Sequence, residues 1–210
     1  SRLTYEDGSN DYKNKFNTII KKQINHLINE IEGSEWADDK IIGCAAIILT
    51  GISYKDKNHY LKTGLNLLRK LVKFSFDNDG FPKSRNIRQL CFYLKYFILI
   101  REWLKESQGE IPDFINENIY YLGQGYAFTW QNNKKDFLFN GNHEINNINF
   151  DHYLKKLGYN FKNHGNELGG YAILNNKKNS LIMDVGSSPD KKFSSNYQAG
   201  ALSFEIISNG

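Results

Sequence analysis

Cysteine and long apolar runs are both scarce in this sequence. The only two cysteines, Cys44 and Cys91, fall on apolar faces of predicted helices, without the paired spacing of zinc or redox motifs. We therefore expect both to be buried free thiols. The longest apolar stretch, residues 90–104, is interrupted by three charged side chains, whereas a membrane-spanning helix needs about 18 consecutive apolar residues or more. The sequence therefore predicts no membrane span.

A strong charge of either sign is also lacking. The 27 lysines and arginines barely outnumber the 23 acidic residues, which gives a net charge of +4. The lysines are scattered along the chain, whereas a nucleic-acid-binding domain gathers its basic residues on one face. We therefore predict no nucleic-acid partner, while the mild basicity remains compatible with an anionic ligand.

Familiar catalytic and cofactor motifs are missing as well. None of the five histidines has a partner at the spacing of a zinc site (His26, His59, His143, His152 and His164). The segment Gly123-Gln124-Gly125 lacks the third glycine of a dinucleotide-binding loop and precedes a predicted strand. No nucleophile elbow is present. The sequence therefore predicts neither a metal nor a cofactor.

Helical periodicity dominates the chain up to about residue 122. Apolar residues recur at helical spacing in four stripes, and a fifth, short helix opens at Pro112. Gly33 and Gly51 are predicted to end the first two helices. Short loops between such helices predict an all-α layer of antiparallel neighbours. The four stripes lie in residues 16–31, 41–49, 60–72 and 87–100.

Short alternating segments replace the helical pattern after residue 122. They predict strands at residues 126–130 and 137–139, a hairpin of residues 171–174 and 180–185, and a short helix at 151–158. In the closing strand Leu202, Phe204 and Ile206 alternate with Ser203, Glu205 and Ile207. Because a turn signal follows this strand without a partner strand, we expect the chain to be an incomplete part of a larger protein.

The order of these elements predicts the fold class. Helices first and strands afterwards indicate an α+β chain of two domains, all-α in residues 1–122 and β in residues 123–210. The expected β domain is the start of an antiparallel sandwich.

Two polar segments are the candidate functional regions. In the first, Ser84 or Asn86 is predicted to cap the most apolar helix, and Arg85 could bind a substrate carboxylate in bidentate fashion. The alternative is a helix cap with a solvent-exposed arginine. In the second, Asn196, Tyr197 and Gln198 place amides and a phenol before the closing strand, and the alternative is an ordinary loop.

Four short phrases occur in a characteristic order along the chain. They are Asp79-Gly80 through Ser84-Arg85-Asn86, Phe137-Leu138-Phe139-Asn140-Gly141, Leu181-Ile182-Met183-Asp184-Val185-Gly186 and Ala199-Gly200-Ala201-Leu202-Ser203-Phe204-Glu205. In this order they resemble the heparinase II/III-like family of bacterial polysaccharide lyases, which join an α/α-toroid to a β-sandwich. The resemblance implies β-elimination of an acidic polysaccharide at a cleft between toroid and sandwich. In that reaction a carboxylate is neutralised, a base removes the proton alpha to it, and an acid protonates the leaving oxygen.

The resemblance also implies a set of site residues. Asn196, Tyr197 and Arg85 are the predicted catalytic residues, although Asn196 and Gln198 stand where the family has a histidine pair. The predicted substrate-binding residues are Ser84, Asn86, Gln89, Gln198 and Asn140. The alternatives are a non-catalytic carbohydrate-binding or envelope protein on the same scaffold, and a structural α+β module without a glycan ligand. Only the resemblance suggests a location, the periplasm or cell envelope.

Overall fold

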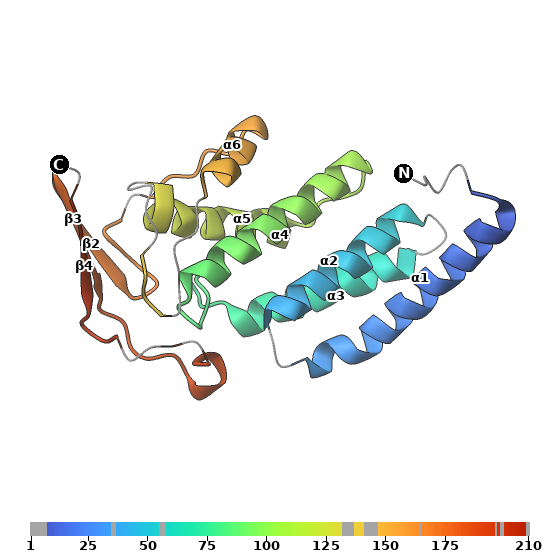
Figure 1. Cartoon of the computed structure of the whole chain (residues 1–210), viewed down its shortest axis with the longest axis horizontal. Helices are drawn as coiled ribbons and strands as arrows, with labels where there is room; N and C mark the ends of the chain where they lie inside the picture. Colours follow the sequence, from blue (N-terminus) through green and yellow to red (C-terminus); the bar gives the residue numbers. More distant parts are fainter. Residues whose placement is uncertain are drawn as a thin grey trace. The chain divides into compact units, whose positions relative to one another are not determined.

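The computed structural model describes residues 8–34, 37–54, 58–131, 137–140, 147–163, 165–195, 197 and 200–208. Contacts within the chain form two compact units, residues 1–71 and residues 72–210. Helices precede strands along the sequence (Figure 1), which confirms the predicted α+β fold class. The predicted domains, residues 1–122 and 123–210, stay a prediction.

The first unit is built from helices. It contains α1 (Asn10–Glu30), the short 3-10 turn η2 (Ile31–Gly33), α2 (Ala37–Ser53) and most of α3 (Asn58–Ser75). The side-chain oxygen of Ser9 caps α1 by accepting the Tyr12 N–H at 3.3 Å. Helix α2 supplies half of the buried apolar side chains described in this unit, namely Ile41, Cys44, Ala45, Ile47 and Ile48.

Gly51 was predicted to end the second helix, and this prediction is wrong. Helix α2 continues to Ser53, and a Cβ atom at Gly51 would lie 2.3 Å from the backbone nitrogen of Leu61 in α3. A side chain there would therefore collide with the neighbouring backbone. Gly51 is a site of close helix packing, which a single sequence cannot distinguish from a helix stop.

The second unit begins with a helical layer. It contains α4 (Ile87–Glu106), α5 (Asp113–Tyr126), its π-helical continuation η4 (Ala127–Gln131) and α6 (Ile148–Lys156). Helices α4 and α5 pack against each other. Helix α4 is the most buried of these, with Leu90, Leu94, Phe97, Ile98, Ile100 and Leu104 all inaccessible to solvent. The predicted short helix near residues 151–158 is confirmed as α6.

The strand predicted at residues 126–130 is wrong. Residue 126 ends α5, and residues 127–131 continue as a π-helix. Residues 137–139 are described and form no strand, while the turn predicted between the two lies largely outside the described residues. The side chains of Tyr126, Phe128 and Trp130 are each at most 4% exposed. A segment buried on every side has no polar face, so its sequence shows no helical period.

A four-stranded antiparallel sheet follows in the same unit. Its strands are β1 (Glu167–Leu168), β2 (Tyr171–Asn175), β3 (Asn179–Asp184) and β4 (Phe204–Ser208), and neighbouring strands pair in the order β1-β2-β3-β4. Figure 1 labels β2, β3 and β4. The predicted hairpin is confirmed as β2 and β3, and the Asn176 side chain closes its turn by accepting the Lys178 and Asn179 N–H groups at 2.8 Å. A 3-10 turn, η5 (Lys191–Phe193), lies between β3 and β4.

The sheet has two chemically different faces. Register pairing puts Tyr171, Ile173, Ile182 and Ile207 on one face, where they are buried. The predicted alternation in the closing strand is confirmed. Ile207 lies on this buried face, whereas Phe204 and Ile206 lie on the opposite, exposed face. That face carries Ala172, Leu174, Leu181, Met183, Phe204 and Ile206. Leu174, Phe204 and Ile206 are 65%, 59% and 64% exposed, so this sheet presents apolar side chains to solvent.

None of the helices in the described part of the chain is both long enough and apolar enough to cross a bilayer.

Candidate active site

Arg85 is the centre of a buried polar network in the second unit. It precedes α4 with a left-handed backbone, φ +57°, and its side chain is 9% exposed. The guanidinium donates hydrogen bonds to the carbonyls of Gly169 (3.1 Å), Ser187 (3.0 Å) and Gly170 (2.8 Å), and it forms an ion pair with Asp184 at 2.5 Å. Arg85 therefore joins the loop before α4 to the two ends of the β2–β3 hairpin.

Tyr171, Asn140 and Asn86 extend this network. The guanidinium lies 4.8 Å from the centre of the Tyr171 ring, and the Tyr171 hydroxyl donates to the Arg85 carbonyl at 2.6 Å. The Asn140 amide donates to the Tyr171 hydroxyl, and the Asn86 amide donates to the Asn140 carbonyl at 2.9 Å. Burial raises the pKa of Tyr171, so this phenol stays protonated and serves as a hydrogen-bond donor.

Glycines in the two hairpin ends make room for the guanidinium. A Cβ atom at Gly170 would lie 2.8 Å from Arg85 Nε, and one at Gly186 would lie 2.7 Å from Arg85 Cζ. Gly170 also has φ +80°, a conformation that residues with side chains rarely adopt. The backbone can therefore close on Arg85 only because these positions lack side chains.

Ser84, Asn86 and Gln89 form the cap of α4. The Asn86 side-chain oxygen accepts the Gln89 N–H at 3.1 Å, and the Ser84 hydroxyl donates to the Gln89 side-chain oxygen at 2.5 Å. The prediction that Ser84 or Asn86 caps this helix is confirmed, with Asn86 as the capping residue. Because Asn86 is only 6% exposed, the cap belongs to the interior of the unit.

A pocket of about 320 Å³ lies beside this network. Arg85, Gly170 and Gly186 form part of its wall, together with Lys83 and Phe193. The Lys83 ammonium group donates to the carbonyls of Lys73 and Phe74 at the end of α3, at 3.3 and 3.1 Å. Asp77, Asp79, Ser187, Ser188 and Asp190 also line the pocket, so it carries charges of both signs.

An aromatic pair with lysines stands at the edge of the pocket. The rings of Phe74 and Phe193 are 5.1 Å apart, and the Lys192 ammonium lies 5.3 and 5.1 Å from their centres. Phe74 is 48% exposed. An exposed aromatic surface with adjacent cations is suited to a ligand that combines an apolar face with negative charge.

The structure describes only one of the three polar residues predicted in the closing segment. The Ser188 hydroxyl donates to the Tyr197 hydroxyl at 3.4 Å, and Ser188 lines the pocket. Asn196 and Gln198 lie outside the described residues. The structure thus brings together Arg85, Asn86 and Asn140, with Ser84 and Gln89 in the adjoining cap, and it places Tyr197 near the pocket.

Tyr171 and Asp184 are members of the network that the sequence did not identify as site residues. Asp184 is fully buried and lies 99 residues from Arg85 along the chain. The available signal was its place in the Leu181–Gly186 phrase, where a charged residue follows an apolar strand. A buried aspartate needs a partner, and Arg85, which the sequence assigned to a substrate carboxylate, is the cation that pairs with it. Within the described part of the chain, no group of three histidine, cysteine or acidic side chains is arranged to hold a metal.

Comparisons with known proteins agree with the order of the elements. Residues 164–210 match the family described as heparinase II/III-like, C-terminal. The crystal structure of heparinase III resembles the chain with a TM-score of 0.72 at 16% identity, over 95% of this chain. The chain spans 37% of the length of that protein. A search of curated proteins finds no match. The structural likeness at this identity concerns the fold.

Proposed function

We propose a function for the natural protein that contains this chain, because residues 164–210 match the heparinase II/III-like family and the fold is similar to that of heparinase III over 95% of the chain. It binds an acidic, uronate-containing polysaccharide and cleaves it by β-elimination. The observation that supports this proposal is a pocket whose wall joins the loop before α4 to the segment after β3, where Tyr197 is hydrogen-bonded to the wall residue Ser188.

The reaction sets three requirements. A proton leaves C5 of the uronate, the C4–O bond breaks, and the electron pair forms the C4–C5 double bond. The departing oxygen takes up a proton, and the carboxylate beside C5 must be neutralised while negative charge develops. Tyr197 is the proposed acid or base, and the amides of Asn196 and Gln198 are the proposed donors to the carboxylate. The aromatic pair of Phe74 and Phe193 supports binding of the sugar ring.

Arg85 has a supporting place in this proposal. Its donors already serve Asp184 and three backbone carbonyls, so it holds the walls of the pocket in position. The predicted direct contact between Arg85 and a substrate carboxylate stays a prediction. The Asn86 amide donates to the Asn140 carbonyl, so both residues are part of the same network. Like Arg85, they are proposed to hold the site in position.

The test incubates the natural protein with a panel of uronate polysaccharides and follows the ultraviolet absorbance of the unsaturated product. Tyr197→Phe should retain binding but lower the rate by about 10²-fold or more, the usual contribution of a general acid or base. Tyr120→Phe is the matched control, because Tyr120 is 59% exposed and its described ring contact is with Tyr121, which is not part of the pocket wall, whereas Tyr197 is hydrogen-bonded to the wall residue Ser188. Equal rates in both variants would contradict the assignment of Tyr197.

The second candidate is a non-catalytic carbohydrate-binding protein on the same scaffold. The lysine-flanked aromatic pair favours it, because stacking on a sugar ring requires no proton transfer. In that case the panel gives binding without any growth of absorbance, and Phe193→Ala weakens the binding. Absence of both binding and absorbance across the panel would leave only the structural module.

A further inference from the structure

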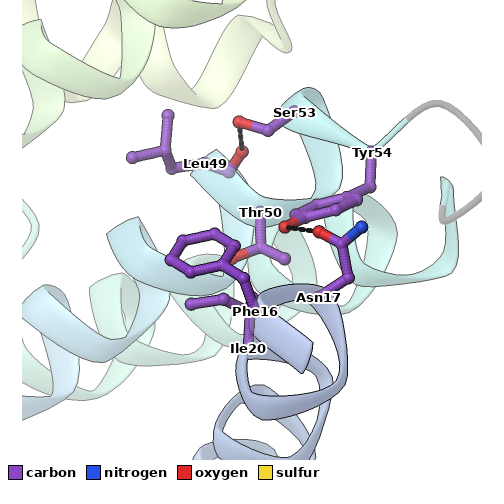
Figure 2. Close-up of a pocket in the computed structure, with 7 residues that line it drawn as sticks. All are labelled: Phe16, Asn17, Ile20, Leu49, Thr50, Ser53 and Tyr54. Carbon is purple, nitrogen blue, oxygen red and sulfur yellow. Dashed lines mark hydrogen bonds between the residues drawn. The ribbon is translucent and has the colours of Figure 1, made fainter. Parts of the chain in front are cut away.

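A second pocket lies within the first unit, between α1 and α2. Its volume is about 560 Å³, which falls in the range of small-molecule sites, about 300–1,000 Å³. Figure 2 shows its lining side chains, which come from the start of α1 and the end of α2. They are Phe16, Asn17, Ile20, Leu49, Thr50, Ser53 and Tyr54.

The polar groups of this pocket are arranged as acceptors. The Thr50 hydroxyl donates to the Ala46 carbonyl at 2.9 Å, and the Ser53 hydroxyl donates to the Leu49 carbonyl at 2.8 Å. Each hydroxyl has a single hydrogen, so its oxygen can accept a further bond from a ligand. One helical turn separates the two side chains, and they therefore share one face of α2. A ligand that carries hydroxyl groups can donate to both oxygens.

Tyr54 and Asn17 join the two helices at the same place. The Tyr54 hydroxyl donates to the Asn17 side-chain oxygen at 2.9 Å, and Figure 2 shows this bond next to Thr50. The contact holds α1 and α2 at the wall of the pocket. The pocket is thus formed before any ligand binds, which lowers the entropic cost of binding.

The remaining wall is apolar and uncharged. Phe16 is 37% exposed and Leu49 is 38% exposed, and both line the pocket with Ile20. No lining residue carries a charge at neutral pH, although α1 has lysines close by in sequence. An anionic group would find no cationic partner in the lining. A pyranose ring fits this surface, because its C–H face packs on apolar and aromatic groups while its hydroxyls form hydrogen bonds.

We propose that the pocket between α1 and α2 binds a neutral sugar residue. The choice of a polysaccharide as the ligand class rests on the proposed function. The site itself is independent of the pocket beside Arg85, because the two pockets share no lining residue and only the pocket beside Arg85 has charged residues in its wall.

The test titrates the 210-residue chain with two probes, a neutral β-1,4-glucan hexasaccharide and an oligogalacturonide, by calorimetry and by NMR shifts. The glucan should bind with a Kd of roughly millimolar or tighter and shift resonances of the lining residues. Phe16→Ala and Thr50→Val should each weaken this binding, about tenfold for Phe16→Ala. Ile19→Ala is the matched control, since Ile19 is 54% exposed on the same helix and does not line the pocket.

Three results overturn the proposal for this pocket. The first is a lack of glucan binding at a glucan concentration of roughly 10 mM. The second is glucan binding that both variants leave unchanged. Binding of the oligogalacturonide alone, with shifts confined to residues 72–210, overturns this site but keeps the proposed function. If Phe16→Ala abolishes glucan binding and the natural protein shows no lyase activity, the result supports this site and contradicts the proposed lyase function.

Discussion

Replacing Arg85 by alanine should destabilise the second unit more than any exposed charge change. The substitution removes an ion pair at 2.5 Å and three hydrogen bonds to backbone carbonyls, and it leaves Asp184 buried as a charge without its cation. Breaking one partner of a buried pair costs about 3–5 kcal/mol. For a unit of this size that corresponds to a fall in Tm of roughly 10–20 °C.

Urea denaturation followed by tryptophan fluorescence is the assay, because Trp103 and Trp130 both lie in the second unit. Lys15→Ala is the control, since its ion pair with Asp11 has side chains more than 70% exposed and should change the free energy of unfolding by less than about 1 kcal/mol. A double variant, Arg85→Met with Asp184→Leu, should recover much of the loss, because both charges are then absent. A loss below about 1 kcal/mol in Arg85→Ala would refute the reasoning.

Three further predictions concern the glycine beside Arg85, the protonation of Glu205 and the exposed face of the sheet. Gly186→Ala should lower the free energy of unfolding by about 1–3 kcal/mol, because the new Cβ would lie 2.7 Å from Cζ of the buried Arg85 guanidinium. Gly33→Ala is the control and should be nearly neutral, since a Cβ there meets nothing within 4 Å. Urea denaturation measures both variants. Burial raises the pKa of Glu205, so the native state binds the carboxyl proton more tightly than the unfolded state does. The stability that the protonated form contributes is therefore lost as pH rises through the native pKa. Glu205→Gln, which has no such proton, should show a smaller fall in Tm over the same acidic pH range. Phe204→Ser with Ile206→Ser should reduce binding of an apolar fluorescent dye to the chain without lowering Tm, since both side chains are about 60% exposed.

The sequence predicted elements well where one face of an element is polar. The helical stripes and the β2–β3 hairpin have such faces, and both were confirmed. The prediction was wrong for residues 126–130, which are buried on every side. Two glycines lie just before this segment, and a Cβ atom at Gly123 or Gly125 would lie 2.1 Å from the Phe161 ring or 2.5 Å from the Leu90 side chain, respectively. They are close-packing glycines within a helix.

The candidate site was only partly predictable, for a different reason. The cap by Asn86 is local, since its hydrogen bond spans three residues, and the sequence predicted it. The pairing of Arg85 with Asp184 spans 99 residues, so no local pattern contains it. A cation in a polar loop is equally compatible with solvent, a ligand or a buried carboxylate. Only the tertiary fold, which places the two hairpin ends around Arg85, decides between them.

The buried pair has a consequence for the proposed chemistry. Apolar residues of similar volume would often stabilise a protein as well as a buried ion pair does, so stability alone is a weak reason for the pair. Arg85 instead fixes three carbonyls, in Gly169, Gly170 and Ser187, and all three residues line the pocket. Directional bonds set the position of these walls in a way that apolar contacts do not. Loss of Arg85 should therefore disturb both folding and ligand binding, whereas loss of Phe193 at the pocket edge should disturb binding alone.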